Sequence, residues 1–321
     1  MVKVTTFFKL IRSTNLLFIA GTQLLFYYCV MLPLYNEVPY TVRLTELNCF
    51  LLLLASTCIA AAGNIINDYF DINIDLINKP NQLIVGKLMS KRSAIAWHLL
   101  LSFIGICISF YISNELQQRW WWLGWCNMAV VFVLVLYSVS LKKKLIIGNV
   151  TIALLTAWVI IVMVLSQFQL YYPPSMAPYS TVLKDTFTKL FRIGILYATF
   201  AFVITLLREI VKDMEDIIGD QRNGCRTIPI TWGTHISKSI VASITVVLIL
   251  LLLLVQFYIL QYYWYYAILF NLVAIVIPLV FSTKILIAAT VSIHYHTLST
   301  WYKYIILTGI ISMIFFKVYE T

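Results

Sequence analysis

The stretch from Leu47 to Asp75 reads L-N-C-F-L-L-L-L-A-S-T-C-I-A-A-A-G-N-I-I-N-D-Y-F-D-I-N-I-D and joins a long apolar run to a cluster of acids. The apolar run has about the 20 residues that a helix needs to cross a bilayer. If the helix continues, Asn67, Asp71 and Asp75 are spaced i, i+4 and i+8 and share one face, with Asp68 beside them. Neighbouring acids repel one another unless a cation neutralises them, and their oxygens suit Mg²⁺, which in turn binds phosphate groups. The stretch therefore predicts a membrane helix that ends in a metal site.

A second acidic cluster lies in R-E-I-V-K-D-M-E-D-I-I-G-D, from Arg208 to Asp220, and it also follows an apolar run. Asp216 and Asp220 are again spaced i, i+4, and Asp213 lies one turn earlier. Either cluster alone also fits an acidic helix end that faces water. Because two clusters stand in equivalent positions, and acids at a membrane are usually functional, we favour one divided site that the rest of the chain brings together.

The composition is that of a polytopic membrane protein. Of the 321 residues, 61% are hydrophobic and 11% are charged, whereas soluble proteins average about 25% charged residues. The net charge of +10 comes from basic residues spread over the loops, which argues against nucleic acid as a partner. The six cysteines form no C-x-x-C pair and are interpreted as small core residues. We predict one all-α integral-membrane domain over residues 1–321.

Nine apolar segments are predicted to be membrane-spanning helices. They are Asn15–Tyr35, Leu47–Asp68, Ala94–Ile112, Trp121–Leu141, Ile147–Gln167, Phe191–Leu207, Ile240–Leu260, Tyr265–Phe281 and Trp301–Val318. In spans one to four, and again in spans five to eight, an acidic cluster follows the second span. This arrangement suggests an internal duplication to which a ninth helix is added.

The distribution of Lys and Arg indicates the orientation in the membrane. With a cytoplasmic N-terminus, 17 of the 23 basic residues face inward, in agreement with the positive-inside rule. The outward-facing basic residues are Arg43, Arg119, Lys184, Lys189, Arg192 and Lys317. Both acidic clusters then lie in cytoplasmic loops, and a bacterial cell membrane is the expected location. No small-residue cleavage site occurs near Tyr35, so the first helix is expected to be retained.

Basic and polar residues near the clusters are candidates for binding a diphosphate, because acids and metal alone leave its charge incompletely balanced. The candidates are Arg12, Asn64, Lys79, Tyr137, Lys142, Arg208 and Lys212. Lys142 follows Y-S-V-S-L at a predicted membrane boundary, although the three lysines that begin there also fit a basic surface loop. Glu209 and Glu215 fall off the acidic face and are expected to pair with Arg208 or Lys212.

Together these motifs resemble those of the UbiA superfamily of intramembrane prenyltransferases. The resemblance rests first on N-D-x-x-D-x-x-x-D from Asn67 to Asp75 and on D-x-x-D-x-x-x-D from Asp213 to Asp220. Further similar pieces are L-I-R-S-T-N at 10–15, Y-S-V-S-L-K at 137–142, I-G-N-V at 147–150 and G-C-R-T-I-P-I at 224–230. The resemblance covers nearly the whole chain.

The resemblance implies a helical bundle around a central cavity, in which two Mg²⁺ ions bridge a polyprenyl diphosphate to the two motifs. The implied metal ligands are Asn67, Asp68, Asp71, Asp75, Asp213, Asp216 and Asp220. The implied catalytic residues are Asp71, Asp75, Asp216, Asp220 and Lys142. Once the leaving diphosphate is stabilised, the C1–O bond would break to give an allylic cation. An acceptor would then attack C1 while closed loops keep water away.

Within the family, D-I-N-I-D-L-I-N-K-P-N resembles the digeranylgeranylglyceryl phosphate synthase branch, whose acceptor is a glycerol-phosphate ether lipid. Where that branch commonly has an Arg-Pro step, this chain has Gln82-Leu83. Arg is a natural ligand for an acidic head group, and Lys87 would be its substitute here. A geranylgeranylglycerol-phosphate-like acceptor is the first expectation, and an aromatic or quinone-precursor head group stays open.

Two other classes of membrane protein share parts of this pattern. A secondary transporter has repeats and intramembrane acids, but those acids are expected near the middle of the membrane rather than at span ends. A phosphatidyl-alcohol transferase would need a D-G-x-x-A-R signature, which the sequence lacks. The resulting prediction is a Mg²⁺-dependent polyprenyl transferase that works among membrane lipids.

Overall fold

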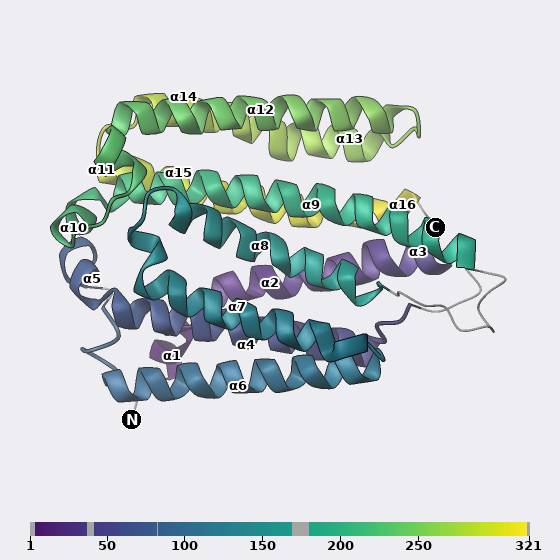
Figure 1. The fold of residues 1–321 in the computed structure, drawn as a ribbon. Helices are drawn as coiled ribbons and strands as arrows, with labels where there is room; N and C mark the ends of the chain where they lie inside the picture. The colour runs from purple at the N-terminus through teal and green to yellow at the C-terminus, as the bar shows by residue number, and fades with distance from the viewer. Residues whose placement is uncertain (1–3, 37–41, 82, 169–179, 320–321) are drawn as a thin grey trace. The chain divides into compact units, whose positions relative to one another are not determined.

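The computed structural model describes residues 4–36, 42–81, 83–168 and 180–319. In these ranges the chain is helical, with one isolated β-bridge between Val85 and Met89 and no strand (Figure 1). The prediction of an all-α protein is therefore confirmed. Gln82, which stands where the synthase branch commonly has Arg, lies outside the described residues, as does Lys3, one of the basic residues expected to face inward.

Nine helical segments of the described chain are long and apolar enough to cross a membrane, which confirms the predicted number and order of spans. The first span combines α2 (Ser13–Leu25), η1 (Phe26–Met31) and α3 (Leu32–Asn36). The next five are α4 (Glu46–Phe70), α6 (Lys91–Glu115), α7 (Trp122–Val139), α8 (Ile147–Ser166) and α9 (Ser180–Glu215). The seventh is α12 (Thr234–Leu260), and the eighth combines α13 (Tyr265–Asn271), η5 (Leu272–Val276) and α14 (Ile277–Ala288). The ninth combines α15 (Ser292–Ile311) and α16 (Ile314–Tyr319).

Short helices lie before and between the spans. They are α1 (Val4–Leu10), α5 (Ile72–Asn78), η2 (Arg119–Trp121), η3 (Leu141–Lys143), α10 (Ile217–Arg222) and α11 (Ile228–Trp232). Two of them, α5 and α10, follow directly on the long helices that carry the acidic clusters. The short helices therefore matter more for the candidate site than their length suggests.

The sixth span is longer than its apolar pattern predicts. The pattern predicts Phe191–Leu207, whereas α9 has 36 residues, from Ser180 to Glu215, which is about 54 Å at 1.5 Å per residue. Arg208, Lys212 and Asp213 therefore lie on a helix and not in a loop, which corrects the sequence prediction. Hydropathy marks the part of a helix that suits a bilayer, so it misses turns that continue beyond the apolar run.

Two spans contain a π-helical turn shortly before a proline, η1 before Pro33 and η5 before Pro278. A proline has no N–H for the carbonyl four residues earlier in a helix. For Pro278 that carbonyl belongs to Ala274, and it accepts a 3.0 Å hydrogen bond from Thr308 Oγ1 of α15. The ninth span therefore supplies a hydrogen bond to a carbonyl that cannot receive one from Pro278.

The chain divides into two compact units, one with residues 1–139 and 158–196, the other with residues 140–157 and 197–319. In the first unit, α4 packs against α2, α6 and α7. Gly105 of α6 permits a close approach, because a Cβ there would lie 2.6 Å from Ile59 Cγ1 and 3.0 Å from the Ala55 carbonyl oxygen. Small residues allow membrane helices to pack closely in this way.

In the second unit, the C-terminal half of α9 packs with α12, α14 and α15 around an apolar core. Its buried residues include Ile204, Leu207, Val241, Leu279, Leu298 and Tyr302. Lys238 of α12 donates hydrogen bonds to the carbonyl oxygens of Ile287 and Ala289 at the end of α14. These contacts satisfy carbonyls that a helix end leaves without partners. The core therefore holds in place the end of α9 on which the second acidic cluster begins.

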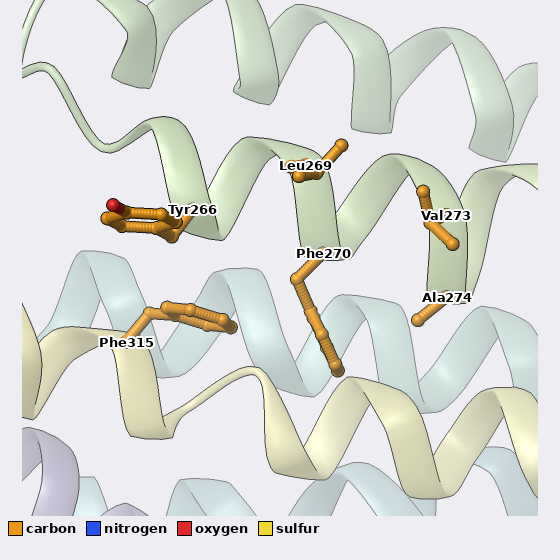
Figure 2. Close-up of a pocket in the computed structure, with 6 residues that line it drawn as sticks. All are labelled: Tyr266, Leu269, Phe270, Val273, Ala274 and Phe315. Carbon is orange, nitrogen blue, oxygen red and sulfur yellow. The ribbon is translucent and has the colours of Figure 1, made fainter.

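An apolar groove of about 690 Å³ lies in the same unit (Figure 2). It is lined by Tyr266, Leu269, Phe270, Val273, Ala274 and Phe315. The rings of Phe270 and Phe315 lie next to each other in this lining, with 5.2 Å between their centroids. Because its lining carries no acid or base, the groove is not a candidate for binding a diphosphate or a metal ion.

Candidate functional site

The first acidic cluster lies on α4 and α5, and Asp71 is the joint between these helices (Figure 1). Asp71 has φ −89° and ψ 0°. Helical hydrogen bonds continue through the joint: Asp71 N donates to Asn67 O at 2.9 Å, and Asp75 N donates to Asp71 O at 2.8 Å. Lys79 N then donates to Asp75 O at 2.8 Å. These residues form one row along the helix surface, as their i, i+4 spacing predicts.

The second cluster has the same local construction. α9 ends and α10 begins on either side of Asp216, which has φ −100° and ψ 11°. Asp216 N donates to Lys212 O at 2.9 Å, and Asp220 N donates to Asp216 O at 3.2 Å. In both clusters a long helix meets a short one at an aspartate, with a lysine and a second aspartate in the same row.

Side-chain contacts also organise the first cluster. Asn67 Nδ2 donates a 2.7 Å hydrogen bond to Asp71 Oδ2. Arg12 Nη2 donates a 2.7 Å hydrogen bond to Asp68 Oδ1, and the two side chains are 40% and 18% exposed. The structure thus places Arg12, a predicted diphosphate-binding cation, directly against a predicted metal ligand.

The corner between α1 and α2 brings Arg12 to this position. Arg12 has φ 53° and ψ 57°, a left-handed conformation that is uncommon for residues other than glycine. Asn64 Nδ2 of α4 donates a 2.9 Å hydrogen bond to the carbonyl oxygen of Ile11, the residue before Arg12. Asn64, which the sequence suggests as a substrate ligand, therefore supports the backbone beside Arg12. Direct binding of substrate by Asn64 stays a prediction.

Asp75 lies in surroundings that combine burial with nearby acids. Burial, followed by the charges of Asp71 and Asp68, raises the pKa of Asp75 to about 6, although Lys79 and Arg12 act in the opposite direction. A carboxyl group near other carboxylates holds its proton more tightly because the negative charges repel. Burial and the neighbouring acids together therefore disfavour the charged form of Asp75 in the metal-free protein.

Polar contacts also border the second cluster. Asn149 Nδ2 of α8 donates a 2.8 Å hydrogen bond to Asp213 Oδ2 of α9. Glu209 accepts hydrogen bonds from Arg208 at 2.7 Å and from Lys212 at 3.4 Å, which confirms the pairing predicted for Glu209. Arg208 and Glu209 are 16% and 11% exposed at their side chains. Arg208 and Lys212, two of the predicted diphosphate-binding cations, therefore both pair with the mostly buried Glu209.

Glu215, the last residue of α9, contacts α15 through both its side chain and its backbone. Glu215 Oε1 lies 3.0 Å from His296 Nδ1, and the Glu215 carbonyl oxygen accepts a 3.0 Å hydrogen bond from Ser292 Oγ. The sequence suggested Arg208 or Lys212 as partners of Glu215 and did not suggest α15. The first turns of α15 therefore hold the residue that immediately precedes Asp216.

Lys142 lies in η3, shortly before α8 begins. Its backbone is in tight contact with Gly148, where a Cβ would lie 2.8 Å from Lys142 Cα and 3.1 Å from the Leu141 carbonyl oxygen. Arg226 N donates a 2.9 Å hydrogen bond to the carbonyl oxygen of Lys143. These contacts fix the backbone of Lys142 within the second unit.

The predicted site residues fall into two groups. The first unit contains Arg12, Asn64, Asn67, Asp68, Asp71, Asp75, Lys79 and Tyr137, the last of which is partly buried on α7. The second unit contains Lys142, Arg208, Lys212, Asp213, Asp216 and Asp220. Sequence reasoning missed the roles of Asn149, Ser292 and His296. Asn149 lies in I-G-N-V, so a signal for it was present, whereas nothing in the sequence around α15 indicated the other two.

The donor groups in these clusters suit Mg²⁺. In the part of the chain that the structure describes, no three His, Cys, Asp or Glu side chains are arranged as a complete metal site. Mg²⁺ is usually held by one or two carboxylates, with substrate phosphates and water completing its coordination. Each row offers such carboxylates, and in the first cluster Asp71 and Asp68 lie close enough to Asp75 for their charges to add to the effect of burial on its pKa. The residues therefore fit a metal ion that binds together with an anionic substrate.

Comparison with known proteins identifies the family. Residues 37–290 match the UbiA prenyltransferase family. The chain belongs to this family. The resemblance found in the two acidic motifs is therefore confirmed. With nine helices in its described residues that are long and apolar enough to cross a membrane, this UbiA family member is an integral membrane protein.

Individual relatives of this UbiA family protein agree with the assignment. The digeranylgeranylglyceryl phosphate synthase of Methanosphaera stadtmanae is 30% identical over 199 residues, which are 61% of this chain and 63% of that protein. The matched region thus spans less than two thirds of that relative's length. A solved structure of digeranylgeranylglyceryl phosphate synthase has a TM-score of 0.60 at 23% identity and covers 98% of this chain and 99% of its own. A UbiA homolog from Archaeoglobus fulgidus bound to DMAPP and Mg²⁺ has a TM-score of 0.57 at 14% identity and covers 96% of this chain and 99% of its own. These likenesses confirm the fold.

Proposed function

We propose that this protein transfers a polyprenyl group from a polyprenyl diphosphate to a lipid-soluble acceptor in a Mg²⁺-dependent reaction. The observation that carries the proposal is the construction found twice in the chain, an aspartate joint with a row of Asp and Lys at Asp71 and again at Asp216. Two equivalent rows of acids suit an anion held by metal ions better than they suit two unrelated helix ends. The family assignment and the DMAPP and Mg²⁺ bound to the homolog from Archaeoglobus fulgidus support the same reading.

The acids of both rows would hold the metal, and neighbouring cations would bind the diphosphate. The proposed metal ligands are Asn67, Asp68, Asp71 and Asp75 in one cluster and Asp213, Asp216 and Asp220 in the other. Bound Mg²⁺ supplies positive charge that stabilises the departing diphosphate. Asn67 orients Asp71 through its 2.7 Å hydrogen bond. Arg12 and Lys79 at the first cluster, and Lys142, Arg208 and Lys212 at the second, add the remaining positive charge.

In the proposed reaction the bond between prenyl C1 and the diphosphate oxygen breaks, and its electron pair leaves with the diphosphate. A nucleophile of the acceptor then forms a bond to C1, and the proton that it loses passes to the released diphosphate or to solvent. The allylic cation would react with water if water were present. In the proposed reaction the apolar helices beside the clusters exclude water.

A geranylgeranylglycerol-phosphate-like lipid is the proposed acceptor. Relatives named digeranylgeranylglyceryl phosphate synthase support it. Gln82, which stands where that branch has Arg, lies outside the described residues. Lys87 is exposed in the turn between α5 and α6, where its N–H donates to Ile84 O at 3.3 Å, and its charge is available for an acidic head group. The replaced Arg favours an aromatic or quinone-precursor head group as the second candidate.

The proposal is tested by incubating the purified protein with a panel of prenyl diphosphates and acceptors and recording products by mass spectrometry. One acceptor should gain the mass of one prenyl group in the presence of Mg²⁺, and EDTA should abolish both this product and the binding of prenyl diphosphate. Asp71→Asn protein is the control for non-enzymatic transfer. Prenyl diphosphate binding that EDTA does not change would overturn the metal-dependent mechanism and favour a transporter.

We further propose that the N-terminus is cytoplasmic, that both clusters lie near the cytoplasmic face, and that spans one to four and five to eight arose by duplication. The bias of 17 of 23 basic residues supports the orientation. The matching joints at Asp71 and Asp216, each after the second span of its group, support the duplication.

A further inference from the structure

Asn149 contacts the second acidic cluster but is not one of the acids or cations assigned to it. It lies in the first turn of α8, and its Nδ2 donates a 2.8 Å hydrogen bond to Asp213 Oδ2. Asn149 is 7% exposed. An amide that is buried this far loses free energy unless it is hydrogen-bonded, so its orientation is tied to this bond.

The surroundings of Asp213 make this bond important for the direction of the carboxylate. Glu209 and Asp220 lie near enough to repel Asp213, and Lys212 attracts it. A hydrogen bond from an amide to a carboxyl oxygen is directional, whereas attraction or repulsion between charges that are not in contact is not. Asn149 therefore fixes Asp213 Oδ2 at the start of α8, although two nearby acids repel this carboxyl group.

The position of Asn149 is fixed by its neighbour in the sequence. Gly148 is packed against the backbone of Lys142 so closely that a Cβ at Gly148 would lie 2.8 Å from Lys142 Cα. The start of α8 is therefore fixed against η3. One short segment thus places both Lys142, a predicted diphosphate-binding cation, and the amide that orients Asp213.

We propose that Asn149 is a positioning residue for metal binding at the second cluster, through the orientation that it gives to Asp213. This inference rests on the proposed Mg²⁺-dependent function. Partners that hydrogen-bond to metal-binding carboxylates fix the geometry of the ligand, and their removal typically lowers metal affinity about 10- to 100-fold. Asn149 would act in this way without touching the substrate.

The test measures Mn²⁺ binding to purified protein by electron paramagnetic resonance of the free ion. Asn149→Ala removes the donor, and Asn149→Leu removes it while keeping the side-chain volume, so that at least one variant retains the packing at α8. We expect both to bind Mn²⁺ about 10- to 100-fold more weakly than the unmodified protein. We also expect turnover in these variants to recover as the Mg²⁺ concentration is raised, with the KM for prenyl diphosphate measured at saturating Mg²⁺ unchanged.

Asn127 of α7 provides the matched control. It is 3% exposed, donates to Ser109 Oγ at 2.8 Å and accepts from Trp158 Nε1 at 3.0 Å. Asn127→Leu should lower thermal stability as much as Asn149→Leu does but leave Mn²⁺ affinity unchanged. Equal losses of affinity in the Asn127 and Asn149 variants would make the effect one of general stability and overturn the inference.

The failure of this inference and the failure of the proposed function give different results. If the unmodified protein binds Mn²⁺ and the Mn²⁺ affinity of the Asn149 variants is within twofold of its own, the positioning role is wrong and the proposed function stands. If the unmodified protein binds no Mn²⁺, with or without inorganic pyrophosphate, the metal-dependent function itself is wrong, and the positioning role is wrong with it.

Discussion

Arg12 and Asp68 form a 2.7 Å ion pair that joins the corner between α1 and α2 to the first acidic motif. The pair puts a guanidinium group beside the acids that are expected to bind metal. An acid with an adjacent cation at this position has two consequences for substrate binding. The acid is held in one orientation, and the cation is already in place when an anion arrives.

Replacing Arg12 should weaken the binding of prenyl diphosphate. Arg12→Asn is the suitable neutral variant, because Asn tolerates the left-handed backbone at φ 53° better than Ala does. We expect its KM for prenyl diphosphate to rise about 10- to 100-fold, the range for loss of a hydrogen bond to a charged group. Arg12→Lys keeps the positive charge but loses the planar guanidinium group. Its KM for prenyl diphosphate should therefore lie between that of the unmodified protein and that of Arg12→Asn. A KM unchanged in Arg12→Asn would remove Arg12 from the substrate site.

Asp71→Asn and Asp216→Asn should each reduce turnover on the order of 10²-fold or more, and the double variant should be little worse than either. Each change keeps the size of the side chain but removes a charge that a metal needs. Residues that act as one unit give such non-additive losses. Turnover and melting temperature in detergent check the prediction, since removing one of several repelling acids should leave the melting temperature unchanged or slightly raised.

Glu215→Gln is the internal control for these variants. Gln can still accept the hydrogen bond from His296, and Glu215 lies off the row of Asp216 and Asp220. Most activity should therefore remain. If Glu215→Gln lost as much activity as Asp216→Asn, the assignment of the helical face would be wrong. If both aspartate variants kept full activity, the clusters would be helix ends that only contact solvent.

The stability of the metal-free protein should fall as pH rises from about 4 to about 6, in part because of Asp75. The pKa of Asp75 is raised from 3.8 to about 6 in the folded protein, so in this window the folded state holds a proton that the unfolded chain has lost. Asp75→Asn carries no charge at any pH and should flatten this part of the profile. Melting temperatures in EDTA between pH 4 and pH 8 provide the measurement. In EDTA at pH 7, a melting temperature of Asp75→Asn below that of the unmodified protein would contradict the prediction.

Gly148→Ala should reduce turnover on the order of 10²-fold, the size of effect that a shift of about 1 Å in a positioned group produces. A methyl group at this position would lie 2.8 Å from Lys142 Cα, and backbone rather than a flexible side chain would have to move. Gly21→Ala is the matched control, because nothing lies within 4 Å of a Cβ there. The control should keep full activity, and equal activity in both variants would show that η3 tolerates the displacement.

If each of the nine apolar helices in the described residues crosses the membrane once, the N-terminus and the C-terminus are expected on opposite sides of it. Single cysteines at positions 143 and 320, labelled with a membrane-impermeant thiol reagent in intact cells and in inverted vesicles, test this. Position 143 should react from the cytoplasmic side and position 320 from the outer side. Labelling of both from the same side would contradict the odd number of crossings.

Much of the fold could be predicted because membrane insertion depends on local composition. An apolar run of about 20 residues identifies a span wherever it occurs, and all nine were found in this way. The ends of α9 were not found, because the turns from Ser180 to Lys189 and from Arg208 to Glu215 continue the helix with polar residues. Hydropathy contains no information on a helix beyond its apolar part.

The rows of acids could also be predicted, because the i, i+4 spacing is written in the sequence. The joints at Asp71 and Asp216 could not, since neither a glycine nor a proline marks them. The bonds from Asn149 to Asp213 and from His296 to Glu215 join residues 64 and 81 positions apart. Such contacts depend on how helices pack, which no local pattern specifies. The metal ligands and the acceptor stay predictions.

The border between the two compact units falls inside helices, between Ala157 and Trp158 in α8 and between Leu196 and Tyr197 in α9. A chain cut between the fifth and sixth spans would therefore give two fragments that each contain incomplete portions of both units. Neither fragment could complete a folding unit by itself. Reassembly of a split version of this protein would require that both fragments be inserted into the same membrane.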